Sequence, residues 1–305
     1  MQSDSSIRNY FEERVSTDSD GVNQKIFGYL SSYVKKIESP VILDIGAGTG
    51  AVIRRMVKSA EIANPVFYGL DASRDLLDEA RRQIAPLLER MGFAVKGGDQ
   101  VIIATKDKRS VDVHLVTGDF FDEKLQASLE KLPLSGITTH AFLDLVPIEP
   151  TVAIVARLLK KGGFFYSSIN YNGATELFPF FEDRSFEERL LSTYNRSMDE
   201  RRVDSQPAGG SRAGGLLYGA VADHGFKIAG FGSSDWSIFP WNGSYTPTEE
   251  NFLNSLLLTI YEEGLRHSEL DRYSLAAWYA TRSESVEQKA LALLTHQTDL
   301  LAIKK

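Results

Sequence analysis

The 305-residue sequence predicts an α/β protein with a doubly wound, mostly parallel sheet. Short apolar runs alternate with longer segments whose apolar residues recur at helical spacing, an order typical of a parallel sheet with helices on both faces. The first apolar run, 41–45, leads directly into Gly46, Gly48 and Gly50, and a helical pattern follows. A buried strand, a glycine turn and a helix form a cradle in which a ligand can touch bare backbone.

The other elements follow in the order that such a sheet requires. Helices at 7–15 and 22–37 fill an N-terminal region, 1–40, and Pro40 separates them from the first strand. We expect sheet strands at 41–45, 66–71, 111–116, 139–145, 164–169 and 226–231, with helices at 51–60, 75–91 and 151–159. Ser73 is the expected N-cap of the helix at 75–91.

We expect a single domain spanning 1–305, in which three segments are additions to the alternating strands and helices. The β-like runs 101–105 and 111–116 predict an extra edge hairpin within 92–117. The segment 172–223 is expected to form a helical substrate lid, and 248–305 to be C-terminal helices almost throughout. A short strand is expected at 236–239; 273–281 could be a late strand, although its alanines favour helix.

Composition excludes several function classes. The absence of cysteine excludes disulfides, iron–sulfur clusters, zinc–thiolate sites and cysteine nucleophiles. The net charge of −7 argues against nucleic acid as a partner, because such affinity depends on neutralising phosphates. The first 20 residues lack the apolar core of a secretory signal, and no run approaches 18 apolar residues. We therefore expect a cytoplasmic protein that acts on a small molecule, with no membrane partner.

The glycines alone do not identify a cofactor. Gly46, Gly48 and Ala51 satisfy a loose dinucleotide fingerprint, and Asp71 follows at about the spacing that NAD binding requires. Three acids argue against NAD as the ligand. Asp44 precedes the glycines, Asp71 ends the second strand, and Asp119 follows the third. These carboxylates would repel a pyrophosphate. They would attract the ammonium and sulfonium of another ligand and accept hydrogen bonds from its ribose diol and adenine amine.

With these residues the chain resembles the class I S-adenosylmethionine-dependent methyltransferases of small-molecule type. The matching motifs are the run 44–50, Asp71, the triplet 118–120 and the Gly162-Gly163 turn, and the resemblance covers roughly 22–240. It implies a Rossmann-like sheet of seven strands with the last antiparallel, and S-adenosyl-L-methionine as cofactor. The seventh strand is then short or displaced, with 236–239 and 273–281 as the two candidates.

The resemblance also implies roles for individual residues. The loop 46–50 lies against the methionyl part of the cofactor, Asp71 holds the ribose hydroxyls, and Asp119 with Phe120 faces the adenine. The expected cofactor-binding residues are Asp44, Gly46, Ala47, Gly48, Gly50, Asp71, Ala72, Asp119, Phe120 and Leu143.

The substrate side is less well specified. Asp144 lies at the end of the expected fourth strand, where catechol-type methyltransferases place a metal ligand, but the second carboxylate is replaced by Asn170. We therefore expect no metal. Asp144 and Tyr171 are the candidate catalytic residues, and the expected substrate contacts are Tyr10, Asn170, Asn172 and Trp236. His140 and His224 are expected to precede strands, on the side of the sheet away from the site.

The leading hypothesis is methyl transfer from S-adenosylmethionine to an oxygen, nitrogen or carbon nucleophile of a small molecule. One alternative is an NAD(P)-dependent oxidoreductase, although the Tyr-x-x-x-Lys constellation of hydride transfer is not found. Another is a non-catalytic S-adenosylmethionine-binding or scaffold protein. The C-terminal helices could in either case support a homodimer.

Overall fold

The computed structural model describes residues 21–59 and 61–305. Its central sheet has the strand order β5 (Arg109–Thr117), β2 (Val66–Asp71), β1 (Val41–Ile45), β6 (Gly136–His140), β7 (Phe164–Phe178), β12 (Ala292–Lys304) and β10 (Phe226–Ser233). Neighbours pair in parallel except around β12, which is antiparallel to both β7 and β10. The predicted fold class, a mostly parallel α/β sheet with an antiparallel last strand, is confirmed.

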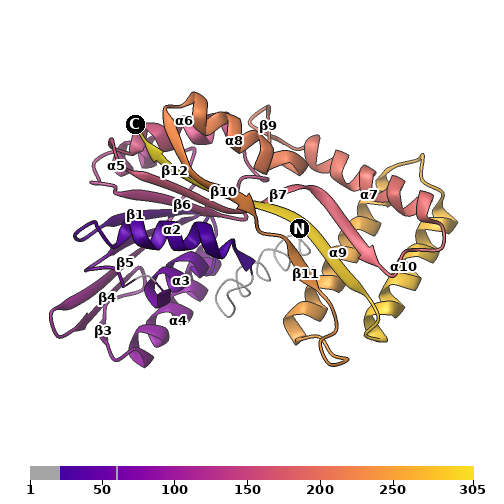
Figure 1. Ribbon diagram of the computed structural model, residues 1–305, viewed down its shortest axis with the longest axis horizontal. Coiled ribbons are helices and arrows are strands. Elements are labelled where there is room, and N and C mark those ends of the chain that lie inside the picture. The colour runs from indigo at the N-terminus through magenta and orange to yellow at the C-terminus, as the bar shows by residue number, and fades with distance from the viewer. Residues whose placement is uncertain (1–20, 60) are drawn as a thin grey trace.

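Helices cover both faces of this sheet (Figure 1). One layer holds α2 (Gln24–Val34), α3 (Ala51–Ser59) and α4 (Arg74–Arg90), and the other holds α5 (Glu123–Leu129), α6 (Ile148–Leu158) and α8 (Ala213–Asp223). Side chains of Asn23 and Ser73 accept the backbone N–H groups that begin α2 and α4, as N-caps do. The helices thereby start at the sheet edge where the parallel strands end.

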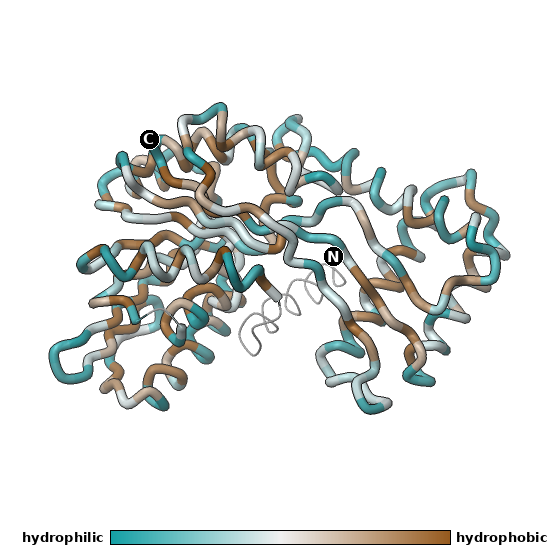
Figure 2. Tube along the Cα trace, viewed as in Figure 1, coloured by the Kyte–Doolittle hydropathy of each residue, from teal (hydrophilic) through white to brown (hydrophobic). Residues whose placement is uncertain are grey.

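An antiparallel hairpin extends one edge of the sheet. β3 (Ala94–Lys96) pairs with β4 (Val101–Lys106), and β4 pairs with β5, which is also the third parallel strand. The inward residues Ile102, Ala104 and Val113 are fully buried. Figure 2 shows hydrophilic residues at the tip of the hairpin, so the added strands share the main core on one face and leave their turn in solvent.

A second lobe is built on the two longest strands. β7 and β12 continue to pair beyond the parallel sheet, from Tyr171 to Phe178 and from Ala292 to Gln297, and β11 (Trp236–Ile238) adds to β12. Three helices accompany this ribbon: α7 (Arg184–Asp199), α9 (Pro247–Arg266) and α10 (Arg272–Glu287). We call the residues 171–199 and 236–297 the ribbon lobe, seen on the right of Figure 1.

The seventh strand corrects the sequence prediction. It is β12, at the C-terminus, and neither 236–239 nor 273–281. The second of these lies in α10, as its alanines indicated, and the first contributes β11, which pairs on β12. The expectation that 248–305 is helical almost throughout is therefore wrong for the last strand. β12 is rich in leucine and alanine, and its pairing with β7 and β10 overrides any helical preference.

The expected lid segment, 172–223, is also not uniformly helical. It begins as strand β7, continues through α7 and the small hairpin of β8 (Arg202–Val203) and β9 (Gln206–Pro207), and reaches the short helix η2 (Gly210–Arg212). Its last helix, α8, buries Leu217 and Val221 against α6 and the sheet. α8 is thus a helix of the layer that covers one face of the main sheet.

None of the helices in the described residues has the length and hydropathy that a membrane-spanning segment requires.

Candidate functional site

The glycine loop after β1 has the backbone that the sequence indicated. Gly46, Gly48 and Gly50 have φ angles of +67°, +51° and +77°, in the left-handed region that glycine adopts without a steric penalty. A Cβ on Gly46 would lie 2.5 Å from the ring of Phe142, and one on Gly50 would lie 2.7 Å from Ile84. At these three positions the loop follows a path that only glycine allows, and it has bare backbone there.

Asp71, the last residue of β2, fixes this loop. One carboxylate oxygen accepts the N–H of Gly48 at 2.9 Å, and the other accepts the N–H of Ser73 at 2.9 Å. Its backbone carbonyl accepts the N–H of Gly118, also at 2.9 Å. The two carboxylate hydrogen bonds hold the carboxylate in one orientation at the end of the strand. The structure thus brings together the first loop, the second strand end and the loop after β5.

The two remaining acids differ in environment. Asp44 is buried within β1, where its carboxylate accepts the hydroxyl of Thr138 at 2.6 Å. Asp119 is exposed two residues beyond β5, and its carboxylate accepts the N–H of Phe121. Because β1, β2 and β5 are neighbours in the sheet, the three acids lie along one edge, formed by the carboxyl ends of the strands. This is the edge where ligands bind in open α/β sheets.

The other expected cofactor residues divide by burial. Ala47, within the loop, is buried and donates its N–H to the Leu70 carbonyl, whereas Ala72 is exposed beside Asp71. The side chains of Phe120 and Leu143 are buried in the core cluster that also holds α6 and α8. Contact by these last two residues with a ligand at the edge would therefore rest mainly on backbone atoms.

Polar side chains also connect β6, β7 and the antiparallel β12 near the ligand-binding edge, where Thr298 lies opposite Asn170. Thr139 donates its hydroxyl to Ser167, and Ser167 donates to the amide oxygen of Asn170, each at 2.8 Å. The amide nitrogen of Asn170 donates to the carbonyl of Thr298 at 2.8 Å. Both ends of the Asn170 amide are thus engaged within the chain, which gives this expected substrate residue a structural role in tying the strands together.

His140 is a residue that the sequence reasoning placed wrongly. The fourth strand runs from Gly136 to His140, so this histidine ends the strand at the ligand-binding edge and does not precede it. Its side chain is buried, and Nδ1 hydrogen-bonds the hydroxyl of Ser168 on β7 at 2.8 Å. Pro133 and Gly136, which favour a strand start before residue 139, were the available signal.

The candidate catalytic residues lie beyond these strand ends. Asp144 is half-buried in the bend after β6, and its carbonyl accepts the N–H of Gly210 at 3.0 Å. Tyr171 begins the ribbon part of β7; its hydroxyl contacts Thr175 and donates to Asn195 of α7, each at 2.9 Å. Burial raises the pKa of Tyr171 above its ordinary value, so the phenol is suited to donating a hydrogen bond and is a poor general base.

The remaining substrate candidates have mixed surroundings. Asn172 is half-buried and accepts the N–H of Gly215 at 3.2 Å. Trp236 is 1% exposed in the core of the ribbon lobe, where its indole N–H donates to Gly21 and its ring packs edge-on against Phe252. The large apolar side chain thus packs the lobe and offers no open surface. Tyr10 lies outside the described residues.

Comparison with known proteins gives only remote likenesses. No family model matches the chain, and no curated protein does. A methyltransferase from Thiobacillus denitrificans, solved with S-adenosyl-L-homocysteine, is 11% identical, with 96% of this chain and 97% of that chain covered and a TM-score of 0.43. The cyclopropane synthase MmaA2 from Mycobacterium tuberculosis is 12% identical, with 94% and 87% covered and a TM-score of 0.41.

A third solved structure is a phosphoethanolamine N-methyltransferase 2 from Haemonchus contortus, which is 14% identical. The match covers 98% of this chain and 57% of that chain, with a TM-score of 0.44. At such identities and scores these likenesses carry no argument about substrate or mechanism. The fold assignment rests on the chain's own strand order, in which the seven main strands run 3-2-1-4-5-7-6 with only strand 7 antiparallel.

Proposed function

We propose that this protein transfers a methyl group from S-adenosyl-L-methionine to an oxygen, nitrogen or carbon nucleophile of a small molecule. The observation that carries the proposal is the Asp71 carboxylate, held by the N–H groups of Gly48 and Ser73 beside a loop of positive-φ glycines. A rigid carboxylate at that position suits a ribose diol, and the neighbouring Asp44 and Asp119 favour a cation over a pyrophosphate.

The residues present fit such a cofactor. The bare backbone of the loop 46–50 would lie against its methionyl part, Asp71 would accept its ribose hydroxyls, and Asp119 would lie on the adenine side. When bound, the cofactor supplies an electrophilic methyl group on a positively charged sulfur. The protein's task is then to bring a nucleophile in line with that methyl group and to exclude water, and much of the rate enhancement can come from this positioning.

A general base is required only when the nucleophile arrives protonated. For such a nucleophile, a basic side chain at the strand ends would take up the proton, while the bound cofactor would supply the methyl group. His140 is the best candidate, because it ends β6 at the ligand-binding edge and Ser168 orients its ring through Nδ1. Asp144, four residues later, is the alternative proton acceptor, whereas the Tyr171 hydroxyl donates to Asn195 and its raised pKa makes it a poor base.

The test is turnover. The purified protein is incubated with S-adenosylmethionine carrying an isotope-labelled methyl group and with a metabolite extract, and labelled products are sought by mass spectrometry. We expect label in at least one small molecule, at a rate proportional to protein concentration. Cofactor binding without any labelled product, across extracts of varied origin, would contradict methyl transfer and favour the non-catalytic alternative.

A homodimer through the C-terminal helices stays a prediction. α9 and α10 bury Phe252, Leu256 and Trp278 within their own chain, so a dimer would have to use their outer faces, where Tyr273 is 84% exposed. Light scattering coupled to gel filtration measures the mass directly: twice 33.9 kDa would support the dimer, and 33.9 kDa would contradict it.

A further inference from the structure

A chain of buried polar side chains leads from His140 into the sheet. Nδ1 of His140 hydrogen-bonds the hydroxyl of Ser168 on β7 at 2.8 Å. Two residues earlier, on the same face of β7, the phenol of Tyr166 hydrogen-bonds Ser168 and lies 3.4 Å from a carboxylate oxygen of Asp299 on β12. These four residues are at most 6% exposed, so the chain connects β6, β7 and β12 inside the core.

The carboxylate of Asp299 determines the direction of the first hydrogen bond. Backbone N–H groups of Asn23 and Ile169 reach its two oxygens at 2.7 Å and 2.8 Å. A backbone N–H can only donate, so both contacts hold the carboxylate as an acceptor. The Tyr166 hydroxyl therefore donates its proton to Asp299.

The remaining directions follow because a hydroxyl has one proton. Tyr166 uses its proton on the carboxylate, so its oxygen accepts from Ser168. Ser168 uses its own proton on Tyr166, so its oxygen accepts from Nδ1 of His140. Each of the three contacts then holds one proton, and the imidazole proton is on Nδ1.

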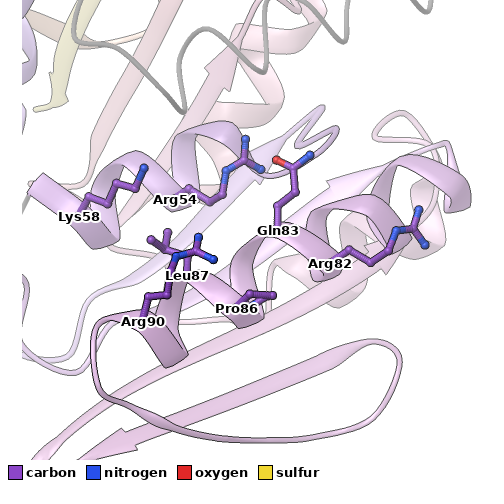
Figure 3. A pocket seen from close by; sticks show the side chains of 7 residues that line it. All are labelled: Arg54, Lys58, Arg82, Gln83, Pro86, Leu87 and Arg90. Atoms are coloured by element: carbon purple, nitrogen blue, oxygen red, sulfur yellow. The ribbon is translucent and has the colours of Figure 1, made fainter.

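The helix α3 brings a cation close to this chain. The guanidinium of Arg55 lies 5.0 Å from the ring centre of Phe27, and that ring packs edge-on against Tyr166. Two other cations of α3, Arg54 and Lys58, instead line a pocket toward α4 (Figure 3). Burial raises the pKa of Tyr166 well above its ordinary value, and the Arg55 charge opposes this only in part. The phenol therefore stays protonated and able to donate.

We infer that Asp299 positions His140 through these two hydroxyls, keeping the imidazole proton on Nδ1 so that Nε2 is the basic nitrogen. The role of His140 as a base rests on the proposed function, whereas the position of its proton does not. When Nε2 takes the proton of a substrate hydroxyl or amine, the ring becomes a cation with a proton on each nitrogen. The Asp299 charge then stabilises that cation through the polarised hydroxyls, and no proton has to move along the chain. Asp299, Tyr166 and Ser168 are thus positioning residues that act through His140.

Nuclear magnetic resonance of the full chain, with isotope-labelled histidine nitrogens, measures the position of the proton directly. The spectra are recorded at a pH of about 8, where an imidazole of ordinary pKa is neutral. The His140→Gln variant loses one pair of ring nitrogen signals and so assigns them. We expect the proton on Nδ1 in the parent chain. Tyr166→Phe frees the Ser168 hydroxyl to donate to Nδ1, so the proton should move to Nε2.

The matched control is Tyr245→Phe in the ribbon lobe. Tyr245 is also buried, and its hydroxyl donates to the Leu291 carbonyl at 2.5 Å. Its loss removes one buried hydrogen bond, as Tyr166→Phe does, and should leave the His140 proton on Nδ1. A proton on Nε2 or a charged ring in the parent chain would overturn the inference. So would an unchanged ring in Tyr166→Phe, or an equal change in Tyr245→Phe.

Steady-state kinetics with the methyl acceptor gives a second readout. Tyr166→Phe should lower kcat about tenfold or more with the affinity for S-adenosylhomocysteine unchanged, whereas Tyr245→Phe should retain kcat within about twofold. A Tyr166→Phe enzyme that loses cofactor affinity but keeps kcat would contradict the positioning role. If the proton is on Nδ1 as expected but no extract yields a labelled product, methyl transfer fails and the assignment of the proton stands.

Discussion

At the residue scale, Asp71 has one role that the structure shows and one that we propose. Its position at the end of β2 predicted contact with a ribose, and its hydrogen bonds to Gly48 and Ser73 add control of the loop. Because the two tasks share one carboxylate, a change at this residue should affect the cofactor more strongly than a change at any exposed acid nearby.

Asp71→Ala should weaken binding of S-adenosylhomocysteine at least tenfold. A hydrogen bond to a charged group contributes about 1.5–3 kcal/mol, and the loop loses its anchor as well. Calorimetry measures the affinity, and Asp99→Ala, an exposed acid in the turn before β4, is the control. Equal affinity in the parent and the Asp71 variant would mean that the ribose does not bind there.

His140→Gln should lower kcat for the methyl acceptor by about 10²–10⁴-fold, the range for a lost general base, with little change in cofactor affinity. His224→Gln is the control, since His224 is the cap residue after α8, where its Nδ1 hydrogen-bonds the Ala220 carbonyl. Steady-state kinetics and calorimetry separate the two effects. A variant that loses cofactor affinity but retains kcat would assign His140 to the binding site and exclude the catalytic role.

The site was predictable in part for a physical reason. Glycines and strand-end acids are read directly from the chain, because their spacing depends on local backbone geometry. His140 was missed because its place at the ligand-binding edge depends on where a strand ends, and a strand shift of a few residues moves it from one edge of the sheet to the other. The engaged amide of Asn170 depends on Thr298, 128 residues away, and no local pattern reports such a contact.

At the element scale, α7 and α10 are joined by a buried ion pair. Arg282 donates to both carboxylate oxygens of Glu187 at 2.6–2.9 Å, and Trp278 donates its indole N–H to the same carboxylate at 2.7 Å. The two charged side chains are 2% and 7% exposed. Removing one partner leaves the other charge buried, which is far more costly than breaking a surface pair.

Glu187→Ala should therefore lower the free energy of unfolding by about 3–5 kcal/mol. The neighbouring Glu188→Ala removes an exposed pair with Arg184 and should cost less than about 1 kcal/mol. Urea unfolding followed by circular dichroism measures both. Similar losses in the two variants would show that the buried pair adds nothing beyond a surface contact.

Asp299 ties β12 to two other elements. Its carboxylate accepts the N–H of Asn23 before α2 and that of Ile169 in β7, at 2.7 Å and 2.8 Å. Ile169 has a φ of +54°, a strained value for a β-branched residue, at the end of the parallel part of β7. Burial raises the pKa of Asp299 above its ordinary value, because the ionised carboxylate is desolvated.

This raised pKa predicts a pH dependence of stability. An acid whose pKa is higher in the folded state contributes most below its unfolded pKa, about 3.9, and loses that contribution as the pH rises through the folded value. The free energy of unfolding of the parent chain minus that of Asp299→Asn should therefore fall as the pH is raised from about 4 toward 7. Urea unfolding at several pH values measures it, and a constant difference would contradict the assignment.

The strand β12 was not predicted from the sequence, and its burial explains why. Residues 298–302 are buried without a break because β12 lies between β7 and β10 with helices on both faces. The buried stretch ends in Leu300, Leu301 and Ala302 and also contains Thr298 and Asp299, so it has no two-residue alternation. Its local pattern therefore does not separate a strand from a buried helix. Only the pairing with β7, more than a hundred residues earlier, determines the outcome.

At the scale of the whole molecule, the parallel sheet was predictable and the ribbon lobe was not. Alternating strands and helices specify a doubly wound sheet through local periodicity. The lobe instead arises because β7 and β12 are longer than the other parallel-sheet strands and carry three helices beyond them, with contacts between distant parts of the chain. Within the lobe, Asn195 of α7 accepts from the Tyr171 hydroxyl and donates to the Gly173 carbonyl, so α7 is tied to the part of β7 that follows the ligand-binding edge.

The central claim is that the acidic edge around the glycine loop accepts a sulfonium cofactor and not a dinucleotide. Isothermal titration calorimetry with S-adenosylmethionine, S-adenosylhomocysteine and NAD on the same preparation tests it most directly. The account predicts one site per chain for the first two ligands and no saturable binding of NAD. Tight binding of NAD with no response to S-adenosylhomocysteine would contradict it and favour the oxidoreductase alternative.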